Sequence, residues 1–239
     1  PLQFLDKQKS WTFPLYGQLY NSLLLKANQL DRTRLISCAA KGSGDWINVL
    51  PSSSLGLHLT DSQLRVASAI RIGAPVSSAH MCTRCGSKAD GNGAHGFVCP
   101  RSTGRHLRHS LMNDVIDRAM HSIQSPTVLE PAGLLIDQNI KPDGISLSPW
   151  EMGKPIAWDV TCAHPSAKSW ASTTSCGSSV ATAVERRKLT KYKDLSMEFF
   201  LQPVSVETYG GYGELTFAFM KKLGSRIADK TGEANSCLY

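Results

Sequence analysis

The sequence predicts a protein of the α/β (α+β) class, in which helices flank a small mixed sheet and a helical segment comes first. Two observations predict this class. Apolar residues recur at helical spacing in residues 1–75, whereas residues 105–239 combine helical spacing with short runs of alternating apolar and polar residues. Between them, residues 76–104 hold a cluster of cysteine and histidine. We therefore expect three parts, with boundaries near residues 75 and 104.

The composition limits the classes of protein and partner. Lysine and arginine number 26 against 19 acidic residues, which gives a net charge of +7 and favours a polyanionic partner. No apolar run approaches the roughly 18 residues that a membrane helix needs, so we expect no membrane partner. Seven cysteines, an odd number, argue against a secreted disulfide framework, and we expect an intracellular, nuclear protein. The chain begins without Met or a leader, so we expect a segment of a longer protein.

The first 75 residues are expected to be helical and without catalytic chemistry. The apolar spacing predicts one helix over residues 19–37, which ends before a glycine-rich stretch. Thr60 and Gln63 have the spacing of a capping box, and the helix that they begin should end at Gly73. The sequence GSG lacks a third glycine and a preceding strand, so it does not predict a nucleotide-binding loop.

The segment MCTRCGSKADGNGAHGFVCP has the spacing of a metal site. Cys82 and Cys85 are separated by two residues, so a tight turn directs both thiolates to one ion. The Gly- and Asn-rich loop that follows brings back His95 and Cys99 as the remaining ligands, and His80 is a possible substitute. Four protein ligands close the coordination shell of zinc. Residues 76–104 are therefore predicted to form a zinc knuckle with a structural Zn²⁺ ion.

The last part is predicted to alternate helices and strands. Its expected elements, in order, are a helix over residues 105–123, a strand over 127–131, a hairpin over 140–161, a helix over 178–195, a strand over 197–207 and a helix over 215–228. The first helix has the clearest apolar stripe, and Ser125 and Pro126 end it. The hairpin carries two acidic residues whose positions require an explanation.

In the strand IAWDVT, the two-residue period places Asp159 on the face opposite to Trp158. Asp143 follows Pro142 at the mouth of the preceding strand, and antiparallel pairing brings the two carboxylates together. Two like charges at short range repel unless a cation lies between them, so the pair predicts a magnesium ion, with Glu130 as a third ligand. A magnesium ion that faces a basic surface is what phosphodiester hydrolysis requires.

The acidic residues also carry a resemblance. Glu130, the Pro-Asp pair that ends at Asp143, and Asp159 occur in an element order that resembles the PD-(D/E)xK superfamily of restriction-like nucleases. The preceding Cys-Cys-His-Cys knuckle and a helix start with Arg105 and His109 resemble one branch of it, the restriction-like endonuclease of site-specific non-LTR retrotransposons. In that branch the endonuclease follows a reverse transcriptase and nicks the target DNA. The resemblance covers about residues 40–210.

The resemblance implies that residues 105–239 form a metal-dependent DNA endonuclease with a catalytic Mg²⁺ ion. Its implied catalytic residues are Asp143 and Asp159, which bind magnesium, together with Glu130, His109 and a lysine. The chain departs from the superfamily at Thr161, where the signature has lysine, so the lysine is expected on the following helix. We expect Lys191, rather than Lys188, to face the sheet. DNA is the implied partner, with an RNA template and an upstream reverse transcriptase in the same polyprotein as further possibilities.

Two basic stretches are the expected nucleic-acid-binding surface. Their residues are Arg101, Arg105, Arg108, Arg186, Arg187 and Lys188. Each catalytic residue also has an ordinary structural interpretation: Asp143 as a turn residue, Asp159 as an exposed strand residue, Glu130 as a strand-end charge and His109 as a packed helix histidine. A second hypothesis therefore remains open: a catalytically inactive, zinc-containing nucleic-acid-binding module derived from a retroelement.

Overall fold

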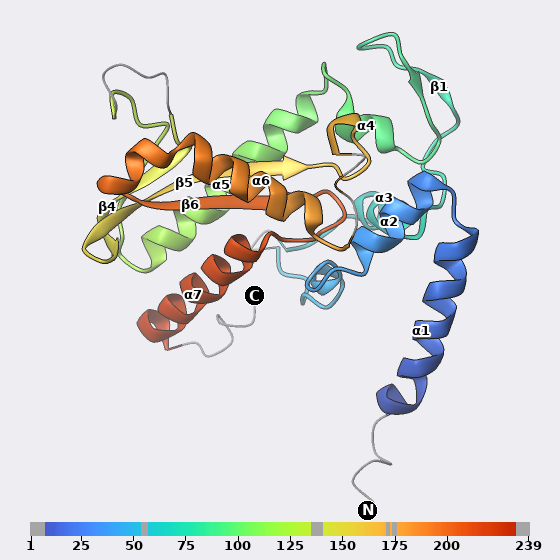
Figure 1. The fold of residues 1–239 in the computed structure, drawn as a ribbon, viewed down its shortest axis with the longest axis horizontal. Coiled ribbons are helices and arrows are strands. Elements are labelled where there is room, and N and C mark those ends of the chain that lie inside the picture. The colour runs from blue at the N-terminus through green and yellow to red at the C-terminus, as the bar shows by residue number, and fades with distance from the viewer. Residues whose placement is uncertain (1–7, 54–56, 135–140, 171–172, 174–175, 233–239) are drawn as a thin grey trace, which may run out of the picture.

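The structure is a computed structural model, and it describes residues 8–53, 57–134, 141–170, 173 and 176–232. It confirms a mixed α/β fold in which helices flank a small mixed sheet (Figure 1). Among the described residues, no helix combines the length and the apolar character that crossing a membrane requires.

The N-terminal part is helical, as predicted, but its first helix differs. The helices are α1 (Gln8–Lys26), α2 (Gln29–Cys38), the 3₁₀ helix η1 (Asp45–Ile47) and α3 (Asp61–Ile72). The single helix expected over residues 19–37 is wrong, because Asn28 interrupts it: its side chain accepts a hydrogen bond from the Asp31 amide and begins α2. The capping box of Thr60 and Gln63 is confirmed at the start of α3, and Gly73 ends that helix at φ 79°.

The cysteine-rich segment forms a small lobe. Its elements are the strands β1 (His80–Met81) and β2 (Lys88–Ala89), which pair antiparallel, and the short helix α4 (Ala94–Val98). Cys82 and Cys85 lie in the turn between the two strands, whereas His95 lies in α4 and Cys99 follows it.

The main sheet has the strand order β3-β4-β5-β6. Its strands are β3 (Thr127–Leu129), β4 (Gly144–Glu151), β5 (Lys154–Ala163) and β6 (Phe200–Glu207). The first three pair antiparallel, and β6 pairs parallel with β5, so the sheet is mixed. The predicted order of helix, three strands, helix, strand, helix is confirmed.

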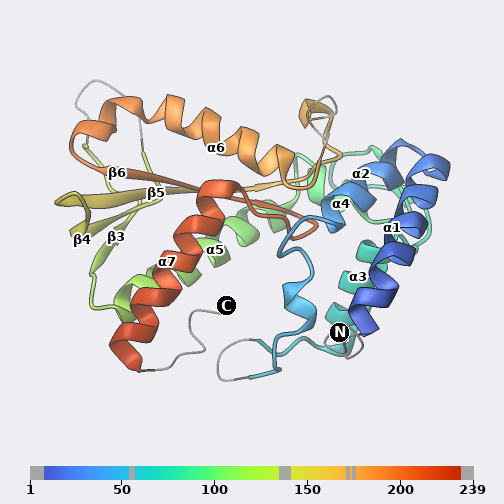
Figure 2. The same ribbon diagram turned by 60° about the horizontal axis from the view of Figure 1, so that its bottom comes forward.

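Helices cover both faces of the sheet. They are α5 (Thr103–Ser122), α6 (Ser179–Lys191) and α7 (Glu214–Thr231), with the 3₁₀ helices η2 (Lys168–Trp170) and η3 (Lys193–Met197). Figure 2 shows α6 on one side of the sheet and α5 and α7 on the other. Ile156, Trp158 and Val160 pack against α5 and α7, whereas Ala157 packs on the other side against Tyr192 and η3. The predicted alternation along β5 is therefore confirmed.

One glycine lets the core close around Trp158. The indole lies directly over the backbone of Gly144, so that a Cβ atom there would lie 2.1 Å from Trp158 Cζ2. Trp158 is fully buried, and its Nε1 donates a 3.0 Å hydrogen bond to Asn113 Oδ1 on α5. Because Gly144 and Trp158 are paired in the ladder, this contact sets the position of the residues next to them, Asp143 and Asp159.

Two buried glutamates, which the sequence analysis did not identify, connect the helices. Glu185 of α6 accepts hydrogen bonds from the amides of Leu215 and Thr216 at the start of α7. Glu207 at the end of β6 accepts from the amides of Val180 and Ala181 at the start of α6. A carboxylate at a helix N-terminus satisfies free amides and the positive end of the helix dipole, so both side chains stabilise helix ends across the fold.

Candidate functional site

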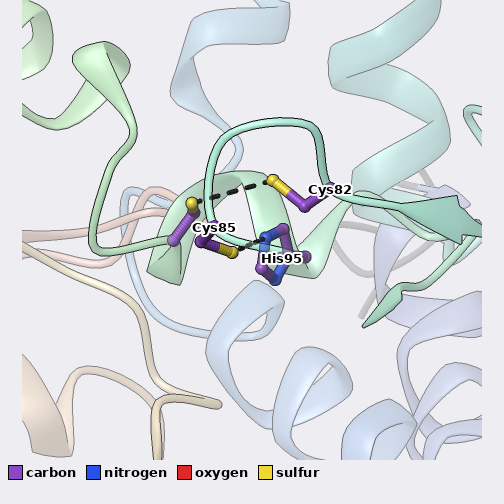
Figure 3. Close-up of side chains that lie close together, drawn as sticks. Cys82, Cys85 and His95 are labelled. Carbon is purple, nitrogen blue, oxygen red and sulfur yellow. Dashed lines mark hydrogen bonds between the residues drawn. The ribbon is translucent and has the colours of Figure 1, made fainter. Parts of the chain in front are cut away.

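The four predicted zinc ligands converge. The ligand atoms of Cys82, Cys85, His95 and Cys99 all lie within 4.8 Å of one another. Cys82 Sγ and Cys99 Sγ are 4.0 Å apart, and Cys85 Sγ and His95 Nε2 are 3.4 Å apart (Figure 3). Zn–S bonds of about 2.3 Å in a tetrahedron imply sulfur atoms about 3.8 Å apart. The four atoms therefore fit the coordination shell of a zinc ion, whereas His80, the possible substitute, hydrogen-bonds to the Ser78 carbonyl.

The protonation of this cluster also favours a metal. Hydrogen bonding to Ser87 lowers the pKa of Cys85 to about 6. A hydrogen bond from the backbone amide of Cys85 is the main cause that lowers the pKa of Cys82. Burial raises the pKa of Cys99. Two thiols are thus shifted toward the thiolate, the form that binds zinc.

The cysteine-rich lobe packs near the sheet through Phe97, an aromatic residue of α4. Phe97 of α4 stacks on His164, which directly follows β5, with ring centroids 5.2 Å apart. The guanidinium of Arg108 on α5 lies over the same ring, 5.3 Å from its centroid. His164 is buried and its Nδ1 is 2.6 Å from Thr208 Oγ1. The lobe therefore contacts α5, which carries His109, and the residue that follows β5, the strand that carries Asp159.

The two aspartates lie side by side, as predicted, where the pairing of β4 with β5 ends: Asp143 directly precedes β4, and Asp159 lies within β5. The Asp143 amide donates to the Trp158 carbonyl over 2.9 Å, which places Asp143 beside Asp159. Asp143 Oδ2 accepts a 2.6 Å hydrogen bond from the Val160 amide and lies 3.0 Å from His109 Nε2. Burial raises the pKa of Asp143; the Val160 amide opposes this rise, and the negative charge of Asp159 adds to it.

Asp159 is the more buried of the two aspartates, with its side chain 8% exposed, and its negative charge is balanced by a neighbouring cation. The Lys188 ammonium forms an ion pair with its Oδ1, and the Tyr192 hydroxyl donates to its Oδ2. Burial, followed by this hydrogen bond to Asp159, raises the pKa of Tyr192. The carboxylate is therefore held from two sides by α6 and the residue that follows it.

The expectation that Lys191 faces the sheet is wrong. Lys191 is the last residue of α6 and is exposed; its Nζ donates to the Tyr192 hydroxyl over 2.9 Å. Lys188 instead lies on the stripe with the buried residues Ala181 and Val184 and reaches Asp159. The reason is that α6 ends at Lys191, so the chain turns and Tyr192 takes the inward direction.

Glu130 and His109 occupy different positions relative to the pair. Glu130 directly follows β3, is exposed and has φ 48°; its amide donates to the Asp143 carbonyl. Its backbone is thus next to Asp143, but among the described residues its carboxylate does not converge with those of Asp143 and Asp159 into a group that could hold a metal ion. His109 lies on α5 and points its Nε2 at Asp143, while its Nδ1 is 3.4 Å from Asn113 Nδ2. Asn113 has no sequence signal of its own.

The predicted nucleic-acid-binding residues fall into two groups. Four of them contact the protein: Arg101 donates to the Arg84 carbonyl, Arg108 to the Phe97 carbonyl, Arg187 lies over the Trp170 ring and Lys188 pairs with Asp159. Arg105 and Arg186 are exposed, on α5 and α6. Both stretches therefore retain an exposed cation on a helix beside the sheet.

The aspartate pair offers carboxylate oxygens, the type of donor that a divalent cation prefers. Both hydrogen-bonding partners of Asp143 fall on Oδ2, and no donor among the described residues reaches its Oδ1. The negative charge of Asp159 raises the pKa of Asp143, so a cation between the two carboxylates would relieve their repulsion. Beside Asp159, however, the hollow lined by Pro142, Lys188 and Tyr192 measures only about 10 Å³, which is close to the volume that admits one water.

Comparison with known proteins adds no assignment. None of the protein-family models matches the chain, and a search of curated proteins finds no significant match.

Proposed function

We propose that the chain is a magnesium-dependent endodeoxyribonuclease of retrotransposon origin, with a structural zinc knuckle, that nicks DNA by phosphodiester hydrolysis. The observation that supports this proposal best is the meeting of Asp143 and Asp159 across β4 and β5, with a lysine and a histidine against them. Such a set combines carboxylates for a metal with groups that hold or move protons. DNA is the proposed partner, and the nucleus is the proposed location.

Each residue has a role in this proposal. Asp143 and Asp159 would hold the magnesium ion, which when bound activates water and stabilises charge on the phosphate. Lys188, whose ammonium is already at Asp159, supplies the positive charge beside the attacking water, a role that the sequence analysis gave to Lys191. Glu130, at the same sheet edge, is the third acidic group. The exposed side chains of Arg105 on α5 and Arg186 on α6 bind the phosphates of the DNA backbone.

A second candidate function is a nucleic-acid-binding module without catalysis. The specific observation that favours it is the state of Asp159: both of its oxygens have partners, and the adjoining hollow admits about one water. In that case Lys188 and Asp159 form a structural ion pair, and only the cysteine-rich lobe and the exposed arginines of α5 and α6 bind nucleic acid.

Plasmid nicking with the Asp143→Asn variant distinguishes the two functions. Under the first, the wild-type chain nicks DNA in magnesium but not in EDTA, and the variant loses about 10²-fold or more of that activity while its affinity for DNA changes little. Asp114→Asn is the matched control, since it removes the same charge from an exposed position of α5. Equal nicking by wild type and Asp143→Asn would refute the assignment. DNA binding without any magnesium-dependent nicking would favour the second candidate.

A further inference from the structure

A chain of hydrogen bonds connects the core to the proposed metal-binding carboxylate. Trp158 Nε1 lies 3.0 Å from Asn113 Oδ1, Asn113 Nδ2 lies 3.4 Å from His109 Nδ1, and His109 Nε2 lies 3.0 Å from Asp143 Oδ2. Asn113 is 8% exposed and Trp158 is fully buried, so solvent competes little for the inner half of this chain. The four residues come from α5, from β5 and from the residue before β4.

Which atom donates in each of these hydrogen bonds follows from Trp158, the buried end of the chain. An indole nitrogen only donates, so the atom of Asn113 that faces Trp158 has to be the amide oxygen. The amide nitrogen of Asn113 therefore faces His109, and an NH₂ group only donates. His109 Nδ1 must then be the ring atom that accepts, and the ring proton must be on Nε2, the atom that points at Asp143.

We infer that Asn113 is a positioning residue, which holds His109 in the Nε2–H tautomer so that His109 donates to Asp143 Oδ2. The Val160 amide donates to the same oxygen. Two donors on Oδ2 fix the rotation of the carboxylate and leave Oδ1 as the oxygen available to a cation. This role rests on the proposed function, whereas the tautomer itself does not.

The nitrogen chemical shifts of the imidazole rings test the tautomer directly. Two-bond ¹H–¹⁵N correlation spectra of the full chain, recorded about two pH units above the ordinary histidine pKa of ~6.5, distinguish Nε2–H from Nδ1–H. The chain has seven histidines, and the His109→Gln spectrum identifies the signal of this one. We expect a single Nε2–H pattern for His109 in the wild-type protein. An Nδ1–H pattern would overturn the inference, whether or not the protein nicks DNA.

Two variants then test whether Asn113 is the cause. In Trp158→Phe the indole donor is lost, the Asn113 amide is free to rotate, and we expect an Nδ1–H population to appear at His109. Trp150→Phe is the matched control, because Trp150 is buried in the same apolar cluster but lies outside this chain of bonds, and its spectrum should keep the wild-type pattern. An unchanged tautomer in Trp158→Phe would overturn the role of the indole and Asn113 in setting it.

Asn113→Leu tests the consequence for activity. Loss of orientation at Asp143 should lower kcat for nicking about tenfold to a hundredfold, with little change in KM. Unchanged kcat in a variant whose His109 has lost the pure Nε2–H pattern would overturn the positioning role. If the wild-type protein shows the Nε2–H pattern but no nicking at all, the proposed function fails and the assignment of the tautomer stands.

Discussion

Replacing Gly144 with alanine should destabilise the protein through Trp158. The new Cβ would lie 2.1 Å from Trp158 Cζ2 and 2.5 Å from Cε2, whereas ordinary carbon contacts are about 3.5 Å or longer. The indole must therefore retreat by at least about 1.4 Å. It is fully buried, so the retreat strains its neighbours and lengthens the 3.0 Å bond from its Nε1 to Asn113.

The size of the effect follows from these two consequences. Overpacking of a core costs about 1–3 kcal/mol, and leaving a buried donor without a partner costs about 1–3 kcal/mol. The loss of unfolded-chain entropy on changing glycine to alanine returns up to about 1 kcal/mol. We expect the free energy of unfolding of Gly144→Ala to fall by about 1–6 kcal/mol.

Urea unfolding, followed by tryptophan fluorescence and circular dichroism, measures this change. Gly17→Ala in α1 is the control, because apart from the adjoining residues and the backbone of its own helix nothing lies within 4 Å of the added Cβ. It should stabilise the helix by up to about 1 kcal/mol. A Gly144→Ala protein within about 0.5 kcal/mol of the wild type would show that the indole has room to move, and the reasoning on this contact would be wrong.

Three further outcomes are expected. Cys82→Ser should reduce the zinc content and lower the Tm by at least about 5 °C, which corresponds to a loss of about 2 kcal/mol at ~2–4 °C per kcal/mol for a chain of this size. A wild-type protein purified without zinc would contradict this. Lys188→Met should slow nicking by about 10²-fold and Lys191→Met only slightly, because only Lys188 reaches Asp159; the reverse order would contradict the assignment. Burial, aided by the charge of Arg108, lowers the pKa of His164 to about 4. Below pH ~6.5 the His164 side chain therefore binds a proton in the unfolded chain but stays neutral in the folded protein until the pH approaches about 4. Stability should therefore fall by up to about 3 kcal/mol between pH 6.5 and 4, and His164→Phe should flatten that slope in urea titrations; an unchanged slope would exclude His164 as its cause.

Features that depend on residues close together in the sequence were predicted correctly. The capping box at Thr60, the antiparallel hairpin with Asp143 beside Asp159, and the convergence of the cysteines with His95 are all present. The helix over residues 19–37 was wrong because the side chain of Asn28, a local signal that was overlooked, caps a new helix.

The side chains that surround the aspartate pair could not be predicted in the same way. Periodicity gives the stripe of a helix but not where the helix ends, and the end of α6 decides that Lys188 rather than Lys191 reaches Asp159. Asn113 is four residues after His109 on α5, yet its function depends on a tryptophan that is 45 positions away in sequence.

By itself the sequence determined the mixed fold class, the order of elements in the last part, the set of four candidate metal ligands and the pairing of Asp143 with Asp159, because these depend on spacing within one turn, one strand or one hairpin. Only the tertiary structure decided which cation compensates Asp159, which helix ends Glu185 and Glu207 cap, and which proton His109 holds. Such contacts join elements that are distant in the chain, and they depend on how each helix is rotated against the sheet, which no local pattern specifies.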